Sequence, residues 1–176
     1  MTSARNQARY QVRFALGADG AREICDGAHI LVWADAIDTG DLDPLTLGYA
    51  GVIVAGTTGS RDAVAAWVLE RQAELGDRIV VAVVAAGGPG GGYAVEDIVA
   101  AGAVIEALAE LGIDSASPEA AAVGGSWIAL RNAGSHVLSA SVAGQSVLAT
   151  GESLDAARET QGKPSVRVIR ELPPTQ

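Results

Sequence analysis

Three segments of the sequence place carboxylates, glycines and small polar residues directly after short apolar runs. They are "ADAIDTGD" (34–41), "GTTGSRD" (56–62) and "AGGPGGGYAVED" (86–97). Carboxylates such as Asp35, Glu96 and Asp97 supply the hard oxygen ligands that Mg²⁺ prefers. A turn of small residues leaves its N–H groups open to a bound anion, and a following cation such as Arg61 strengthens such a site. These residue types therefore indicate metal and anion chemistry.

Each segment also has an ordinary structural explanation. "GTTGSRD" can be a plain strand-to-helix turn in which Ser60 caps the helix. Glu96 and Asp97 can stabilise a helix N-terminus by their charge, and we expect the Glu96 side chain to be partly solvated there. Asp35 is harder to explain, because a charge that ends a strongly apolar run stands at the carboxyl edge of a strand, where function concentrates.

Neither glycine-containing segment matches a nucleotide-binding motif. In "GTTGSRD" no lysine follows the second glycine at the spacing that a Walker loop requires. "GGPGGG" is not preceded by the first strand–helix–strand unit of a dinucleotide fold with its ribose-binding acid. The only histidines, His29 and His136, do not suggest a histidine-based catalytic triad.

A parallel sheet is the element that would bring the three segments together. Short apolar runs bounded by turn residues predict strands buried on both faces within 29–37, 49–56 and 78–87. A helix within 60–76 connects the second and third of these runs, which predicts a right-handed parallel crossover. Ligands of such sheets bind beyond the carboxyl ends of the strands, so we expect all three segments at one edge.

The rest of the chain completes a single α/β domain. We expect a three-layer-like sandwich with a mostly parallel sheet, in which residues 1–10 are a flexible N-terminus, residues 11–172 form the domain and residues 173–176 are a tail. Residues 135–151 are ambiguous between helix and strand. The other expected elements are strands at 11–16 and 164–172 and helices within 19–27, 93–112, 117–132 and 152–160.

The acidic charge of the chain limits its partners. A formal net charge of −9 argues against nucleic acid and against an anionic membrane surface. An anionic small substrate would need a metal or a local arginine to reverse the field. Cys25 is the single cysteine, so no internal disulfide can form, and no apolar run approaches membrane-spanning length. We expect a cytoplasmic protein.

Four stretches of the sequence are similar, in the right order, to motifs of one family. Asp35 falls on the aspartate of an Asp-Val-Leu-Arg-Ala-Thr type motif, and "TTGSRDA" is similar to a Thr-Thr-Asn-Gly-Thr-Arg-Ala motif. Two further segments match a Cys-Ala-Gly…Glu-Asp…Ala-Gly pattern and a C-terminal Gly…Asp…Cys-Ala pattern; the matching positions are Gly87, Glu96, Asp97 and Gly102, and Gly151 and Asp155. Through most of its length the chain thus resembles the 2-phosphosulfolactate phosphatases of coenzyme M biosynthesis.

That resemblance implies a Mg²⁺-dependent phosphatase acting on a small anionic phosphorylated (sulfo)hydroxy acid such as 2-phosphosulfolactate. The metal ligands would come from Asp35, Glu96 and Asp97. Asp35 and Arg61 would be the catalytic residues, and the residues expected to contact the substrate are Thr57, Gly59, Ser60, Arg61 and Gly87. A chain rich in small apolar residues in this family could also form a homodimer.

The departures from the family pattern leave two hypotheses open. Asp38 stands where the motif has an arginine, Thr58 replaces an asparagine, and residues 38–49 replace a longer family insertion. The first hypothesis is a divergent, active phosphatase. The second is a catalytically inactive family member that acts as a small-anion-binding or assembly protein. A nucleotide-binding Rossmann protein is disfavoured by the glycine pattern.

Overall fold

A five-stranded sheet organises the protein. The computed structural model describes residues 6–40, 42–88 and 92–171. The strand order is β1-β4-β2-β3-β5, in which the first four strands are parallel and β5 is antiparallel to β3. The strands are β1 (Val12–Leu16), β2 (Ile30–Ala34), β3 (Val52–Ala55), β4 (Val81–Ala85) and β5 (Arg167–Arg170). The predicted mostly parallel sheet is confirmed.

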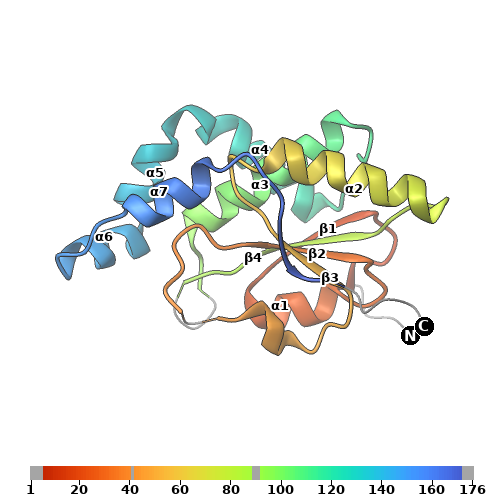
Figure 1. Cartoon of the computed structure of the whole chain (residues 1–176), viewed down its shortest axis with the longest axis horizontal. Coiled ribbons are helices and arrows are strands. Elements are labelled where there is room, and N and C mark those ends of the chain that lie inside the picture. Colours follow the sequence, from red (N-terminus) through yellow and green to blue (C-terminus); the bar gives the residue numbers. More distant parts are fainter. Residues whose placement is uncertain (1–5, 41, 89–91, 172–176) are drawn as a thin grey trace.

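Helices cover both faces of this sheet (Figure 1). Helix α1 (Gly17–Ile24) and the short 3-10 helix η2 (Pro44–Leu47) lie on one face, and α2 (Arg61–Leu75), α3 (Val95–Glu110) and α4 (Pro118–Leu130) lie on the other. Every residue of β2 and β4 is buried, as expected for parallel strands with helices on both sides. The chain is thus an α/β protein with one compact domain.

Helix α3 is the most deeply buried helix of the described chain. It packs on β2 and β4 and lies against α2 and α4, so its residues from Glu96 to Leu108 are buried with few interruptions. Gly102 makes the close approach to α4 possible, because a Cβ at this position would lie 2.3 Å from the carbonyl oxygen of Val123. The first turn of α3 is therefore held rigidly at the carboxyl ends of the central strands.

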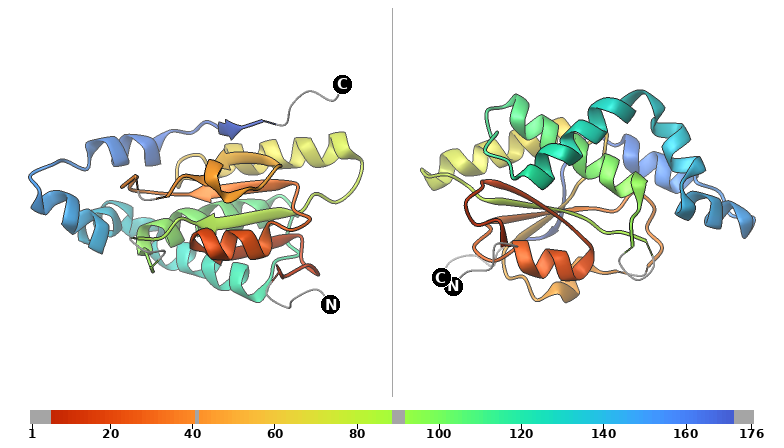
Figure 2. Two further views of the ribbon diagram at one scale, coloured as in Figure 1. Left: turned by 90° about the horizontal axis from the view of Figure 1, so that it is seen from below. Right: turned by 180° about the vertical axis from the view of Figure 1, so that it is seen from behind.

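Three helices near the C-terminus form a separate feature, which we call the cap (residues 134–162). They are α5 (Gly134–Ala140), α6 (Val142–Ala149) and α7 (Asp155–Gly162), preceded by the short η4 (Arg131–Ala133). The cap lies beyond one end of the sheet (Figures 1 and 2), and the chain then returns to pair β5 with β3. The ambiguous segment 135–151 is thus helical, and the Ser141 hydroxyl caps α6 by accepting the Gly144 N–H.

The N-terminal segment contacts the edge of the sheet at β1. The side-chain amide of Gln7 donates to the carbonyl of Phe14 and accepts the Phe14 N–H. These bonds attach part of the segment expected to be flexible, whereas residues 1–5 and the expected tail lie outside the described residues. Among the helices of the described chain, none combines the length and apolar character needed to cross a membrane.

Candidate functional site

The carboxylates predicted from the sequence meet at the carboxyl ends of the two central strands. Asp35 directly follows β2, and Asp97 lies in the first turn of α3, which follows β4. Asp97 Oδ1 accepts the N–H of Ala36 at 2.7 Å, and Oδ2 accepts the N–H of Gly87 at 2.8 Å. One buried carboxylate therefore joins the chain leaving β2 to the chain leaving β4. The carboxyl ends of the strands are the edge of the sheet at which open α/β proteins bind their ligands.

The carboxyl groups at this edge share a poorly solvated environment. Burial raises the pKa of Asp97 to about 7, and the charges of Asp35 and Glu96 act in the same direction, against the bonds from Ala36 and Gly87. A group with such a pKa changes its charge near neutral pH, as catalytic and metal-binding carboxylates often do.

Asp35 behaves in the same way. Burial raises its pKa to about 6, with further contributions from the negative charges of Asp38 and Glu96. The positive charge of Arg167 opposes that rise. The charges of Glu96 and of Arg167, from β5, thus shift the pKa of Asp35 in opposite directions.

Glu96 is buried, which corrects the expectation that it is partly solvated. Only 4% of its surface is exposed, because the first turn of α3 is enclosed together with the rest of the helix. A carboxylate at such a position is costly unless it is protonated, hydrogen-bonded or near a cation. The sequence pattern of a helix start does not reveal this, since burial depends on what packs around the helix.

The donor set at this edge can be compared with the needs of Mg²⁺. Within the ranges that the structure describes, no three His, Cys, Asp or Glu side chains are arranged as a metal-binding group. Each oxygen of Asp97 accepts one backbone N–H and keeps a further lone pair. Mg²⁺ is commonly held by one or two carboxylates with water and substrate oxygens, so the residue types at this edge suit the ion, and a magnesium site here stays a prediction.

The turn predicted to hold phosphate follows β3 and opens helix α2. The N–H groups and the hydroxyls of residues 57–60 all form hydrogen bonds within the protein. Thr57 and Ser60 bond reciprocally: the Thr57 N–H donates to Ser60 Oγ at 3.1 Å, and the Ser60 N–H donates to Thr57 Oγ1 at 3.0 Å. Both residues are buried, and this pair takes the place of an ordinary side-chain cap on α2.

Gln161, from the end of α7, occupies the other two N–H groups of the turn. The Thr58 N–H donates to Gln161 Oε1 at 3.1 Å, and the Gly59 N–H donates to the Gln161 main-chain carbonyl at 2.7 Å. Gly59 permits this approach, because a Cβ there would lie 2.5 Å from the Gln161 carbonyl oxygen and 2.7 Å from the Gly162 carbonyl carbon. Oxygens of the protein thus occupy the positions in which a bound anion would accept these bonds.

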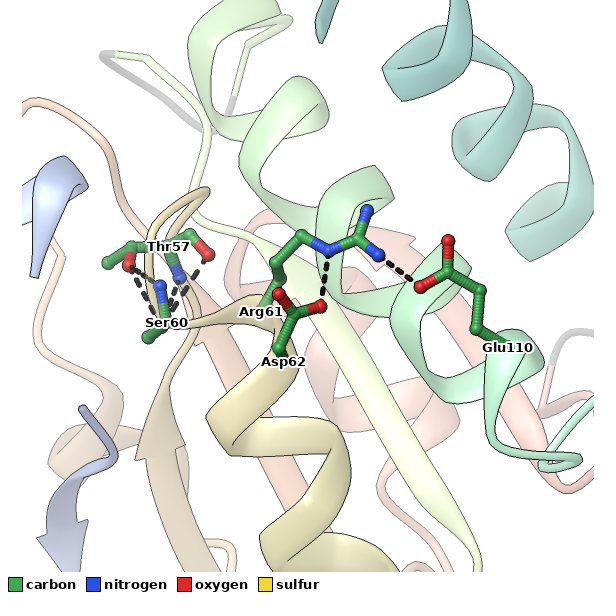
Figure 3. Close-up of polar contacts among 5 residues, drawn as sticks. All are labelled: Thr57, Ser60, Arg61, Asp62 and Glu110. Carbon is green, nitrogen blue, oxygen red and sulfur yellow. Dashed lines mark hydrogen bonds and ion pairs between the residues drawn. The ribbon is translucent and has the colours of Figure 1, made fainter. Parts of the chain in front are cut away.

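Arg61 points away from this turn (Figure 3). Its guanidinium forms ion pairs with Asp62, at 2.8 Å, and with Glu110 on α3. It also lies over the ring of Trp127, 5.7 Å from the centroid. The side chain joins α2 to α3 and α4, and its role as a phosphate ligand stays a prediction.

The structure adds two residues that sequence reasoning missed, Gln161 and Arg167. Gln161 belongs to a polar surface helix and Arg167 to a short edge strand, and neither context signals a site. Alternation along 164–172 predicts the strand but not which carboxylate its arginine approaches. Residues 89–91 of the glycine run, expected to form one wall of the pocket, lie outside the described residues.

Two open pockets of the described chain lie elsewhere. One, of about 380 Å³, is lined by residues that precede β2 and β3, including Cys25 and Tyr49. The other, of about 440 Å³, lies between the end of β1, α3 and α4. Neither is lined by Asp35, Glu96 or Asp97, so neither coincides with the carboxylate edge.

Comparison with known proteins does not assign the chain to a family. No family model matches the sequence, and no curated protein matches it.

Proposed function

We propose that the protein is a Mg²⁺-dependent phosphatase-like hydrolase of a small phosphorylated (sulfo)hydroxy acid such as 2-phosphosulfolactate. The observation that carries this proposal is the coupling of Asp35, Glu96 and Asp97 at the carboxyl ends of the central strands. The resemblance of the surrounding motifs to the 2-phosphosulfolactate phosphatases supplies the substrate class.

In this proposal the three carboxylates have different roles. Asp35 and Glu96 hold the ion, because their oxygens are not committed to backbone N–H groups. A bound Mg²⁺ neutralises phosphate charge and lowers the pKa of a coordinated water. Asp97 is a positioning residue: its bonds to Ala36 and Gly87 hold the segment after β2, which contains Asp35, and the segment after β4 against the first turn of α3, which contains Glu96.

The proposal also needs a cation for the substrate. Arg167 influences Asp35 electrostatically and its side chain is exposed, so it can approach an anion at this edge. Arg61, the residue expected from the family motif, is engaged with Glu110 and Asp62. The arrangement therefore favours Arg167 as the substrate-binding cation.

A second candidate function is a catalytically inactive member that binds a small anion or takes part in assembly, including a homodimer. The observation that favours it is the closed turn after β3, whose four N–H groups from Thr57 to Ser60 all donate to protein oxygens. Asp38, which replaces a family arginine, adds negative charge beside Asp35.

Hydrolysis assays distinguish the two candidates. Phosphorylated hydroxy acids, 2-phosphosulfolactate among them, are incubated with the protein with and without Mg²⁺. We expect Mg²⁺-dependent phosphate release that Asp35→Asn and Glu96→Gln abolish and that Arg167→Ala weakens. Arg61→Ala is the matched cation control and should have the smaller effect. If no phosphate ester is hydrolysed with any divalent metal, the inactive candidate replaces the first.

A further inference from the structure

The contact between Gln161 and the turn after β3 is the strongest feature that the proposed activity does not use. Gln161 is 6% exposed, although α7 is otherwise a polar helix on the surface. Its Oε1 and its main-chain carbonyl face Thr58 and Gly59, but its side-chain Nε2 is buried without a hydrogen-bond partner. An unpaired buried amide costs free energy, so this contact is an imperfect substitute for a ligand.

The cap that carries Gln161 is attached to the domain through few buried side chains. A small apolar cluster, separate from the main core, joins Leu138 and Leu154 of the cap to Ala36 and Ile37. Between Leu154 and Gln161 no residue is buried. Segments with so little buried surface open locally at much lower cost than the core.

Two attachments of the cap lie beside the candidate site. Ala36, in the apolar cluster, also donates its N–H to Asp97, and it directly follows Asp35. Gln161 closes the neighbouring turn after β3. The cap therefore spans the carboxyl ends of β2 and β3, where a substrate phosphate would have to enter.

We propose that α5–α7 form a cap that opens, and that Gln161 is its latch, held in the turn by the N–H groups that a phosphate takes when the cap is open. This inference rests on the proposed function for the identity of the anion. In the closed state the Gln161 oxygens accept from Thr58 and Gly59. In the open state phosphate oxygens replace them, so the anion and the latch compete for the same donors. A ligand that binds only the open state shifts the equilibrium toward it.

Gly59 and Gly162 allow a matched test. Gly59→Ala places a methyl group against the Gln161 carbonyl and wedges the latch out, while Gly162→Ala adds the same group one residue beyond Gln161, into open space. Amide hydrogen exchange is followed by NMR in the full-length chain, without metal, with inorganic phosphate or with chloride at equal ionic strength. We expect Gly59→Ala to speed exchange at Thr58 by about 2- to 10-fold, the equivalent of one hydrogen bond, and Gly162→Ala to leave it unchanged.

The effect of phosphate on amide exchange distinguishes a latch that an anion can replace from a merely structural contact. Gln161→Ala removes only the acceptor of the Thr58 N–H, so exchange at Thr58 should speed up, phosphate should slow it again, and chloride should not. In Gly59→Ala phosphate should have little effect, because the added methyl group lies 2.5 Å from the position of the Gln161 carbonyl oxygen and also obstructs a phosphate oxygen there. In the wild type, phosphate should speed exchange along α7, because it displaces the latch. The inference is overturned if phosphate leaves exchange at Thr58 unchanged in Gln161→Ala. Because no metal or carboxylate takes part, this result is independent of the hydrolysis assay, and either proposal can fail alone.

Discussion

Asp97 and Gln161 make similar hydrogen bonds in two regions of the molecule. Each supplies two oxygens to backbone N–H groups at the carboxyl ends of strands: Asp97 to Ala36 and Gly87, and Gln161 to Thr58 and Gly59. Asp97 belongs to α3, which is buried along most of its length, and Gln161 belongs to α7, in which it alone is buried.

The difference between the two regions lies in the helix that carries the acceptor, because burial of that helix decides how easily the hydrogen bonds can be broken. To withdraw Asp97, α3 would have to leave the core, so the loops after β2 and β4 are fixed. To withdraw Gln161, the end of a surface helix has to move, and little apolar surface is exposed. One end of the candidate site is therefore permanent and the other can open.

The largest expected effect on stability comes from replacing a buried leucine by alanine, and each of the two regions contains one such leucine. Leu108→Ala, in α3, should lower the free energy of global unfolding by about 2–5 kcal/mol, the usual cost of a cavity in a core. Leu154→Ala, equally buried at the start of α7, should change global unfolding much less and instead speed amide exchange across the cap.

Urea unfolding measures the first quantity and hydrogen exchange the second. Equal losses of global stability for the two leucine variants would show that the cap unfolds with the core, which contradicts the division into a fixed and an opening region.

Replacing the carboxylate that fixes the central loops should have the next largest effect. Asp97→Asn leaves one acceptor and turns an amide NH₂ toward a backbone N–H. We expect a loss of about 2–3 kcal/mol in the free energy of unfolding, because one buried N–H is left without an acceptor and a second donor faces it. Asp114→Asn, at an exposed aspartate, serves as the control. A change below that of the control would mean that the two loops are held without Asp97.

The pH dependence of the free energy of unfolding should reflect the titration of Asp35 and Asp97. The folded pKa values of Asp35 and Asp97, about 6 and about 7, lie above the ordinary value of 3.8, so the folded state binds protons more tightly than the unfolded state. The contribution of these two groups to the free energy of unfolding is fully present below pH 3.8. It is lost as the pH rises through 6 and 7.

Thermal unfolding between pH 4 and pH 8 measures this loss, whose slope approaches about 1.4 kcal/mol per pH unit for each group that titrates. Asp97→Asn should flatten the profile above pH 5, and Mg²⁺ should restore stability at the alkaline end because it favours the ionised carboxylates. A profile that rises from pH 5 to pH 8 in the absence of metal would contradict the assignment.

Sequence patterns predict the elements of this fold better than their contacts. Strands β2, β3 and β4 follow from apolar runs bounded by turns, and β1 follows from the alternation of residues 11–16. Helices α2 and α4 follow from helical spacing or capping signals. Residues 135–151 are ambiguous because small apolar and polar residues alternate there without a clear period. The helical outcome depends on the Ser141 cap and on packing against Ala36 and Ile37.

The residues of the candidate site also differ in how well the sequence predicts them. The positions of Asp35 and Asp97 can be predicted, since Asp35 ends a buried run and Asp97 opens the helix that follows the next one, and both places lie at the carboxyl edge of a parallel sheet. The burial of Glu96 and the docking of Gln161 cannot, because each results from tertiary packing between segments far apart in the chain. A polar residue on a solvated helix carries no periodic signal that it will be buried.

Calorimetric titration with Mg²⁺ at pH 8, where both aspartates are ionised, shows whether Asp35 and Glu96 hold a metal ion. We expect saturable binding to the wild type, strong weakening in Asp35→Asn and in Glu96→Gln, and an unchanged affinity in Arg61→Ala. Absence of Mg²⁺ binding to the wild type, or equal affinity in all four proteins, would contradict the claim that the carboxylates at the ends of the central strands form a metal site.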